Sequence, residues 1–128
     1  MDLRAAWSPD GGSIVFERQQ GGRSRLFRVG TDGTGPLPLD ACNDGAETVQ
    51  GRPAFYDADD FVFVSDRDGN LALWRFRGDA VERITDPAGA SDYGPAPLAD
   101  GVVMFFRSDA DGPPYWSPWT GSLSHAAP

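Results

Sequence analysis

A stretch in the middle of the chain recurs almost unchanged near its end. Residues 65–69, Ser-Asp-Arg-Asp-Gly, return as Ser-Asp-Ala-Asp-Gly at residues 108–112, which is an offset of 43 positions. The same offset matches Phe63 with Phe106, and the alignment needs no gap between the two motifs. A fixed period of this size is typical of repeat architectures, in which each repeat is one supersecondary unit. Repetition is therefore the feature that most limits what this chain can fold into.

An earlier copy of the same unit precedes these two. Residues 14–16 align with residues 61–63 at an offset of 47, and the matches continue through the following segment. The start of the unit also repeats, in residues 4–7, 52–55 and 94–97. The sequence thus predicts a single domain, 1–128, made of three repeats at about 2–45, 46–90 and 91–128.

Each unit has the pattern of four short strands. A small-plus-aromatic segment leads into a turn with Asp-Gly or Pro, and an apolar strand follows whose two faces are both hydrophobic. Gly and Pro recur too often for long helices. A small sheet cannot bury both faces alone, so stacked four-stranded antiparallel propeller blades, an all-β fold, are the expected solution. The predicted strands are 5–7, 14–17, 25–29 and 37–39, then 53–55, 61–65, 73–77 and 81–85, then 95–97, 102–107, 115–119 and 122–125.

Two motifs resemble a known repeat family. Residues 7–16, Trp-Ser-Pro-Asp-Gly-Gly-Ser-Ile-Val-Phe, resemble the WSPDG-x-x-I-x-F signature of TolB-like β-propeller repeats, which are WD-like. Residues 63–70 are similar to the strand and SDRDGN hairpin of that family, and residues 26–33 and 83–85 match its other segments. The resemblance covers nearly the whole chain and says little about function, because this repeat serves many proteins.

The resemblance implies a six-bladed ring, and this chain has three units. Residues 55–57 and 97–98 depart from the Trp-Ser-Pro start, and Trp116-Ser117-Pro118 could instead open a degraded fourth unit. Three blades in a row leave two apolar flanks facing water, which favours association. We expect half of a six-bladed propeller, closed by homodimerisation about a two-fold axis. The alternative is a fragment of a longer propeller.

Composition excludes some partners. The chain has 128 residues, 40% of them apolar, and a net charge of −8, so nucleic acid and anionic membrane surfaces are not expected partners. It contains no apolar run long enough for membrane insertion and no signal-peptide pattern, which leaves a cytoplasmic or a processed periplasmic location open. Cys42 is the only cysteine, so an internal disulfide is excluded.

Catalysis has little support in the sequence. His125 is the only histidine, and no G-x-S-x-G, H-E-x-x-H or phosphate-loop motif is present, so we expect no catalytic residue and no cofactor. The favoured function is a binding scaffold for a protein, peptide or small ligand, through the channel rim and loops. The alternatives are the propeller portion of a prolyl oligopeptidase-like hydrolase, or a small-ligand or carbohydrate enzyme with its site in the channel of a closed dimer.

The rim of the propeller channel is the favoured binding site. In a propeller the first strand of each blade lines the channel, and Arg4 and Arg52 occupy matching positions there. Two copies would place four such arginines near the axis of an acidic protein, which suits a carboxylate or another anionic group. Alternatively, these arginines pair with neighbouring carboxylates. The candidate rim residues are Arg4, Glu47, Arg52, Asp92 and Tyr93.

Two further patterns have both a functional and a structural interpretation. The Asp-rich turns could supply oxygens to calcium, but no Glu closes a twelve-residue loop, so hairpin turns are favoured. Trp74 is expected in the core, whereas Trp116 and Trp119 could also form a stacking surface for a ligand. The acidic candidates are Asp66, Asp68, Asp109 and Asp111.

Overall fold

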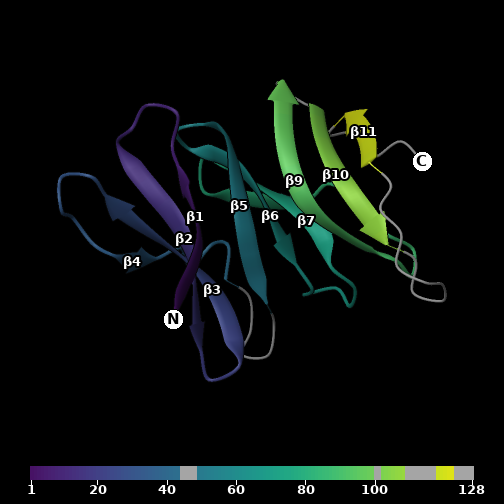
Figure 1. Cartoon of the computed structure of the whole chain (residues 1–128), viewed down its shortest axis with the longest axis horizontal. Helices are drawn as coiled ribbons and strands as arrows, with labels where there is room; N and C mark the ends of the chain where they lie inside the picture. Colours follow the sequence, from purple (N-terminus) through teal and green to yellow (C-terminus); the bar gives the residue numbers. More distant parts are fainter. Residues whose placement is uncertain (44–48, 100–101, 109–117, 123–128) are drawn as a thin grey trace.

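The chain consists of antiparallel β-sheets standing in a row. The computed structural model describes residues 1–43, 49–99, 102–108 and 118–122, and within these its strands form three sheets and no helix (Figure 1). Each sheet is made of consecutive strands, and the middle sheet packs against both of the others. The all-β prediction with antiparallel propeller blades is confirmed.

The first blade contains β1 (Asp2–Trp7), β2 (Ser13–Gln20), β3 (Arg23–Gly30) and β4 (Leu37–Pro38), in that order. The Trp-Ser-Pro-Asp-Gly motif forms the turn between its first two strands. The Ser8 hydroxyl donates to the Asp10 carboxylate at 2.6 Å, and the Gly12 amide donates to it at 2.9 Å. These bonds hold the pKa of Asp10 below its ordinary value. Hydrogen bonds between the side chains and amides of the motif thus stabilise this turn.

The second blade contains β5 (Gln50–Asp57), β6 (Asp60–Ser65), β7 (Ala72–Arg77) and β8 (Ala80–Arg83), again in sequence order. Gly78 and Asp79 form the turn between β7 and β8, with φ values of 54° and 71°. Two positive φ values in a two-residue turn give the twist that matches neighbouring strands. Asp79 is therefore a non-glycine residue in the left-handed region on a hairpin turn.

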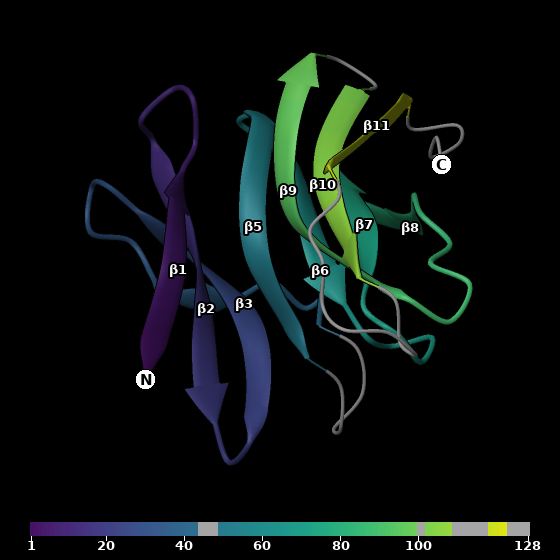
Figure 2. The same cartoon turned by 45° about the vertical axis from the view of Figure 1, so that its right-hand side comes forward.

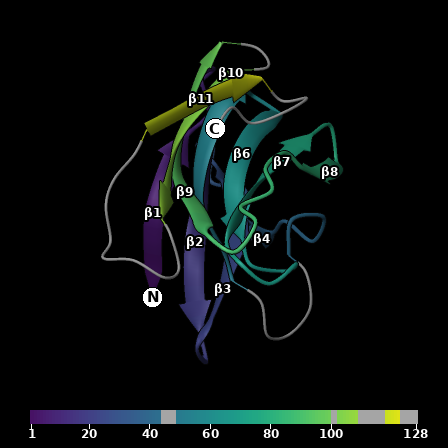
Figure 3. The same cartoon turned by 90° about the vertical axis from the view of Figure 1, so that its right-hand side faces the viewer.

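The third blade contains β9 (Ser91–Ala99), β10 (Val102–Ser108) and β11 (Pro118–Ser122), ordered β11-β10-β9. Figure 3 shows the molecule from the side of this blade. The third strand predicted at 115–119 continues further than expected, because β11 pairs with β10 as far as Ser122; residues 115–117 lie outside the described residues. Proline lacks an amide donor and is tolerated at the first position of a strand. Of the expected fourth strand, Ser122 ends β11 and the rest lies outside the described residues.

The second strand of the middle blade is buried on both faces, as predicted. In β6, Phe61 and Phe63 pack toward the first blade, whereas Val62 and Val64 pack toward the third. This alternation places one apolar cluster at each junction between blades. The first cluster contains Val15, Leu26, Cys42, Phe61, Phe63 and Phe76, and the second contains Val62, Val64, Leu73, Ile84, Val103 and Phe105.

One sequence match shifts by a residue in the structure. The gapless alignment pairs Phe63 with Phe106, but the residue that takes the buried place of Phe63 in the third blade is Phe105. Ladder pairing explains the shift. Phe63 and Phe105 each lie opposite the bulge of the inner strand of the same blade, where two residues of that strand face one residue of the second strand. The hydrophobic faces, and not the conserved spacing of the Ser-Asp motifs, set the register.

Candidate binding site on the inner strands

The inner strands of the three blades lie side by side. Strand β5 contacts both β1 and β9, and Figure 2 shows the three strands in a row. Each contains a bulge at which two of its residues face one residue of the next strand. The first bulge residues have positive φ values, 46° at Arg4, 52° at Arg52 and 64° at Gly94. The arginines that the sequence matched thus share a backbone conformation as well as a position.

Arg4 is engaged by a buried carboxylate. Its Nη1 donates to both carboxylate oxygens of Glu17 at 3.2 Å, and Glu17 is only 3% exposed. The Ser24 hydroxyl donates to the same carboxylate. A Cβ on Gly51 of the second blade would lie 2.3 Å from Glu17 Oε2, so the carboxylate sits directly against the neighbouring inner strand. Glu17 is a junction residue that the sequence analysis missed, although an acid inside an apolar strand could have marked it.

Arg52 differs from Arg4 in its surroundings. It is exposed, and its side chain makes no hydrogen bond or ion pair with any other described residue. A left-handed conformation costs a residue with a Cβ about 1–2 kcal/mol, a cost that glycine avoids. Gly94 shows that the third blade uses glycine at this position. The second blade therefore retains a long, exposed cationic side chain at a strained position.

Asp92 does not belong to an open rim. Its side chain is fully buried, and Arg107 donates to it through Nε at 2.7 Å and through Nη2 at 2.9 Å. Two charge-assisted bonds of this kind occupy both oxygens, so Asp92 is a structural residue of the third blade. Tyr93 packs against the second apolar cluster. Glu47 lies outside the described residues.

The acidic turns use their carboxylates within the protein. Asp66 accepts a hydrogen bond from the Val49 amide at 2.7 Å, and Asp68 pairs with Arg83 at 3.1 Å. In the part of the chain that the structure describes, no three His, Cys, Asp or Glu side chains gather as metal ligands would. Asp109 and Asp111 lie outside that part.

The three tryptophans singled out from the sequence lie in different surroundings, and one of them lies outside the described residues. Trp74 packs against the first apolar cluster, as expected, with the Arg67 guanidinium 4.5 Å from its ring centroid. Trp119 belongs to β11, where it pairs with Phe105 in the ladder. Trp116 lies outside the described residues, so the stacking surface stays a prediction.

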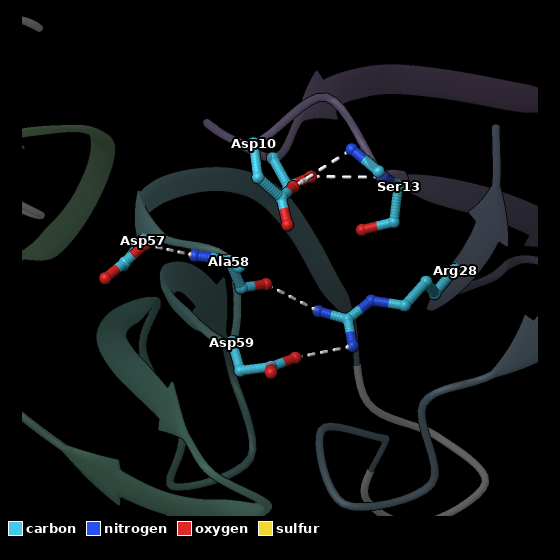
Figure 4. A network of polar contacts seen from close by, with 8 residues as sticks. Asp10, Ser13, Arg28, Asp57, Ala58 and Asp59 are labelled. Carbon is cyan, nitrogen blue, oxygen red and sulfur yellow. Dashed lines mark hydrogen bonds and ion pairs between the residues drawn. The ribbon is translucent and has the colours of Figure 1, made fainter.

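A polar contact also links the first two blades. Arg28 donates to the Asp59 carboxylate at 3.1 Å and to the Ala58 carbonyl at 3.2 Å, across the junction that Figure 4 shows. Its guanidinium also lies 6.0 Å from the ring centroid of Phe76. This arginine binds the blades together and is not available to a ligand.

Comparisons with known proteins agree with this geometry. No protein-family model matches the chain. The chain is 33% identical over 108 residues to uncharacterized protein Atu1656 of Agrobacterium fabrum, covering 82% of this chain and 36% of that protein. A solved structure of a provisional TolB from Agrobacterium tumefaciens superposes with a TM-score of 0.77 at 26% identity, over 96% of this chain and 47% of its own. The fold is that of a TolB-like β-propeller.

Two more distant structures share the propeller fold. TolB from Acinetobacter baumannii matches with a TM-score of 0.73 at 19% identity, over 94% of this chain and 29% of its own. A puromycin-hydrolyzing peptidase from Mycobacterium tuberculosis matches with a TM-score of 0.74 at 17% identity, over 94% and 20%. The TolB-like chain thus spans less than half the length of each of these relatives. Among its described residues there is no helix long and apolar enough to cross a membrane.

Proposed function

We propose that this TolB-like propeller segment is a binding scaffold whose inner strands take an anionic group, such as the terminal carboxylate of a peptide. The observation that carries the proposal is Arg52, an exposed arginine on a strained bulge with no partner among the described residues. Backbone strain that the surrounding structure maintains is a reason to look for function at that residue.

Charge supports an anionic ligand. The chain carries a net charge of −8, so an exposed guanidinium without a carboxylate partner among the described residues is unusual on its surface. A guanidinium can donate two parallel hydrogen bonds to a carboxylate, which gives orientation as well as attraction. Arg4, on the adjacent inner strand, is partly neutralised by Glu17 and contributes less. Arg52 is thus the residue we expect to contact the ligand.

The experiment compares two N-acetylated alanine peptides, one with a free C-terminal carboxylate and one amidated. Titration calorimetry is expected to show binding of the free acid and about a tenfold weaker affinity for Arg52→Gly, which corresponds to one charge-assisted contact of about 1.4 kcal/mol. Because glycine relieves the positive φ, Arg52→Gly should fold at least as stably as the parent protein.

Asp79→Gly is the matched control, because it also relieves a positive φ, on the turn between β7 and β8. It is expected to leave the affinity for the free acid unchanged. Equal binding of the amidated peptide, or unchanged binding by Arg52→Gly, would refute the proposal. One of the two alternatives, a propeller portion of a hydrolase, is supported by the peptidase comparison only at the level of fold.

A further inference from the structure

The outer face of the first blade, the one turned away from the second blade, carries aromatic side chains, and no strand of another blade in the described residues packs against it. Trp7 lies directly opposite Ile14 in the ladder, so both point to this face, and Trp7 is 63% exposed. Phe16 and Phe27 form the next aromatic pair on the same face, with ring centroids 6.0 Å apart. A hollow of ≈ 250 Å³ opens beside Phe16.

The second blade has the same face, and there the first blade covers it. Phe63 and Trp74 occupy the places of Phe16 and Phe27, and the Arg67 guanidinium lies over both rings, at 5.7 and 4.5 Å from their centroids. Arg67 Nη2 also donates to the main-chain carbonyl of Cys42 in the first blade. An arginine thus covers the aromatic pair and links the two blades.

The junction between the second and third blades shows the same arrangement. Arg107 lies 5.7 Å from the ring centroid of Phe105, the counterpart of Phe63. Its Nη2 donates to the main-chain carbonyl of Asp86, at the end of the second blade, at 3.2 Å. At both junctions within the chain, an arginine of the later blade therefore lies over an aromatic ring of its own blade and donates to a main-chain carbonyl of the earlier blade.

The first blade carries the same arrangement on its face turned away from the second blade. The Arg18 guanidinium lies 5.3 and 4.6 Å from the ring centroids of Phe16 and Phe27. It pairs with Asp2 on its own inner strand at 2.7 Å, and the Asp2 side chain is half exposed. The outer face of the first blade thus has the side chains that seat an earlier blade elsewhere in the molecule.

The third blade has the complementary surface. At the internal junction, Val62 and Val64 of the second blade pack against Val103 and Phe105 of the third. Strand alternation places Met104 on the opposite face of β10 from Val103 and Phe105, at the position that Val62 has in the second blade. The described part of the third blade thus has an apolar side chain where the second blade packs against the third, and its described strands make no contact with those of the first blade.

We propose that the outer face of the first blade seats the third blade of a second copy of this chain, and that two copies do so reciprocally about a two-fold axis. Two head-to-tail junctions cover both open faces of each copy and close the ring. The structure from Agrobacterium tumefaciens, of which this chain spans 47%, has the length of about two such segments. The inference rests on the fold and is independent of the proposed anion site.

The experiment is sedimentation velocity on the 128-residue chain and two variants. The parent protein is expected at twice 13.8 kDa, and both Trp7→Arg and Met104→Glu are expected to be monomers with unchanged β-sheet circular dichroism. An equimolar mixture of the two variants should recover dimers. In a mixed pair, one junction joins the unaltered first blade of the Met104→Glu copy to the unaltered third blade of the Trp7→Arg copy. Only a head-to-tail contact gives this recovery.

Leu37→Arg is the matched control, because Leu37 is 67% exposed on the same blade but opposite Arg28, which faces the second blade. This variant and Arg52→Gly should both remain dimers, so failure of the ring and failure of the anion site are distinguishable. A monomeric parent protein, or association that Trp7→Arg does not weaken, would overturn the inference.

Discussion

Removal of the Asp92 carboxylate is expected to destabilise the third blade strongly. The side chain is fully buried, the Arg107 side chain is 18% exposed, and the two hydrogen bonds between them measure 2.7 and 2.9 Å. Deleting one partner of a buried ion pair leaves a charge without compensation, which costs about 3–5 kcal/mol. A typical domain has about 5–15 kcal/mol in total, so Asp92→Ala should lose a large share of the free energy of unfolding.

Urea denaturation followed by tryptophan fluorescence measures this loss. The matched control is Asp59→Ala, because Asp59 pairs with Arg28 at 3.1 Å but is 72% exposed, and such a pair contributes about 1 kcal/mol or less. The double variant Asp92→Leu with Arg107→Met should recover most of the loss, since it removes both charges and retains volume. A cost below about 1 kcal/mol for Asp92→Ala, or a double variant less stable than the single one, would refute the reasoning.

Two other measurements test the junction between the first and second blades. Gly51→Ala should cost about 1–3 kcal/mol of the free energy of unfolding in the same denaturation assay, because its Cβ would displace the buried Glu17 carboxylate. The control is Gly12→Ala, whose Cβ would lie 3.4 Å from Asp10 and which should change stability by less than about 0.5 kcal/mol. Burial raises the pKa of the Cys42 thiol to about 12, so at pH 8 the thiol is protonated and should react with a disulfide reagent only after unfolding. Fast labelling of the native protein at pH 8 would contradict this packing.

Local patterns made the strands and the blades predictable. The Trp-Ser-Pro-Asp-Gly turn depends on hydrogen bonds between residues two to five positions apart, so its sequence alone identifies it. The doubly apolar pattern of residues 61–65 likewise indicated a sheet covered on both faces, which the two core clusters confirm. The errors came where spacing replaced packing, at Phe106 and at the end of β11, which extends to Ser122.

The candidate site was only partly predictable. The matching positions of Arg4 and Arg52 are visible in the sequence, but the bulges that give both a positive φ depend on pairing with the next strand. Nothing local distinguishes Arg4, which a buried Glu17 engages, from Arg52, which faces solvent. The sequence also grouped Asp92 with them, although Arg107 occupies its carboxylate fully.

The sequence by itself determined that this protein is a series of TolB-like propeller blades, because repeat period, turn chemistry and strand alternation are short-range properties of the chain. Only the tertiary structure decided which charged groups are available. Burial and pairing depend on residues of other strands and other blades, and Glu17 meets Gly51 of the next blade for that reason. The same dependence places Arg18 over aromatic rings, as it places Arg67 and Arg107.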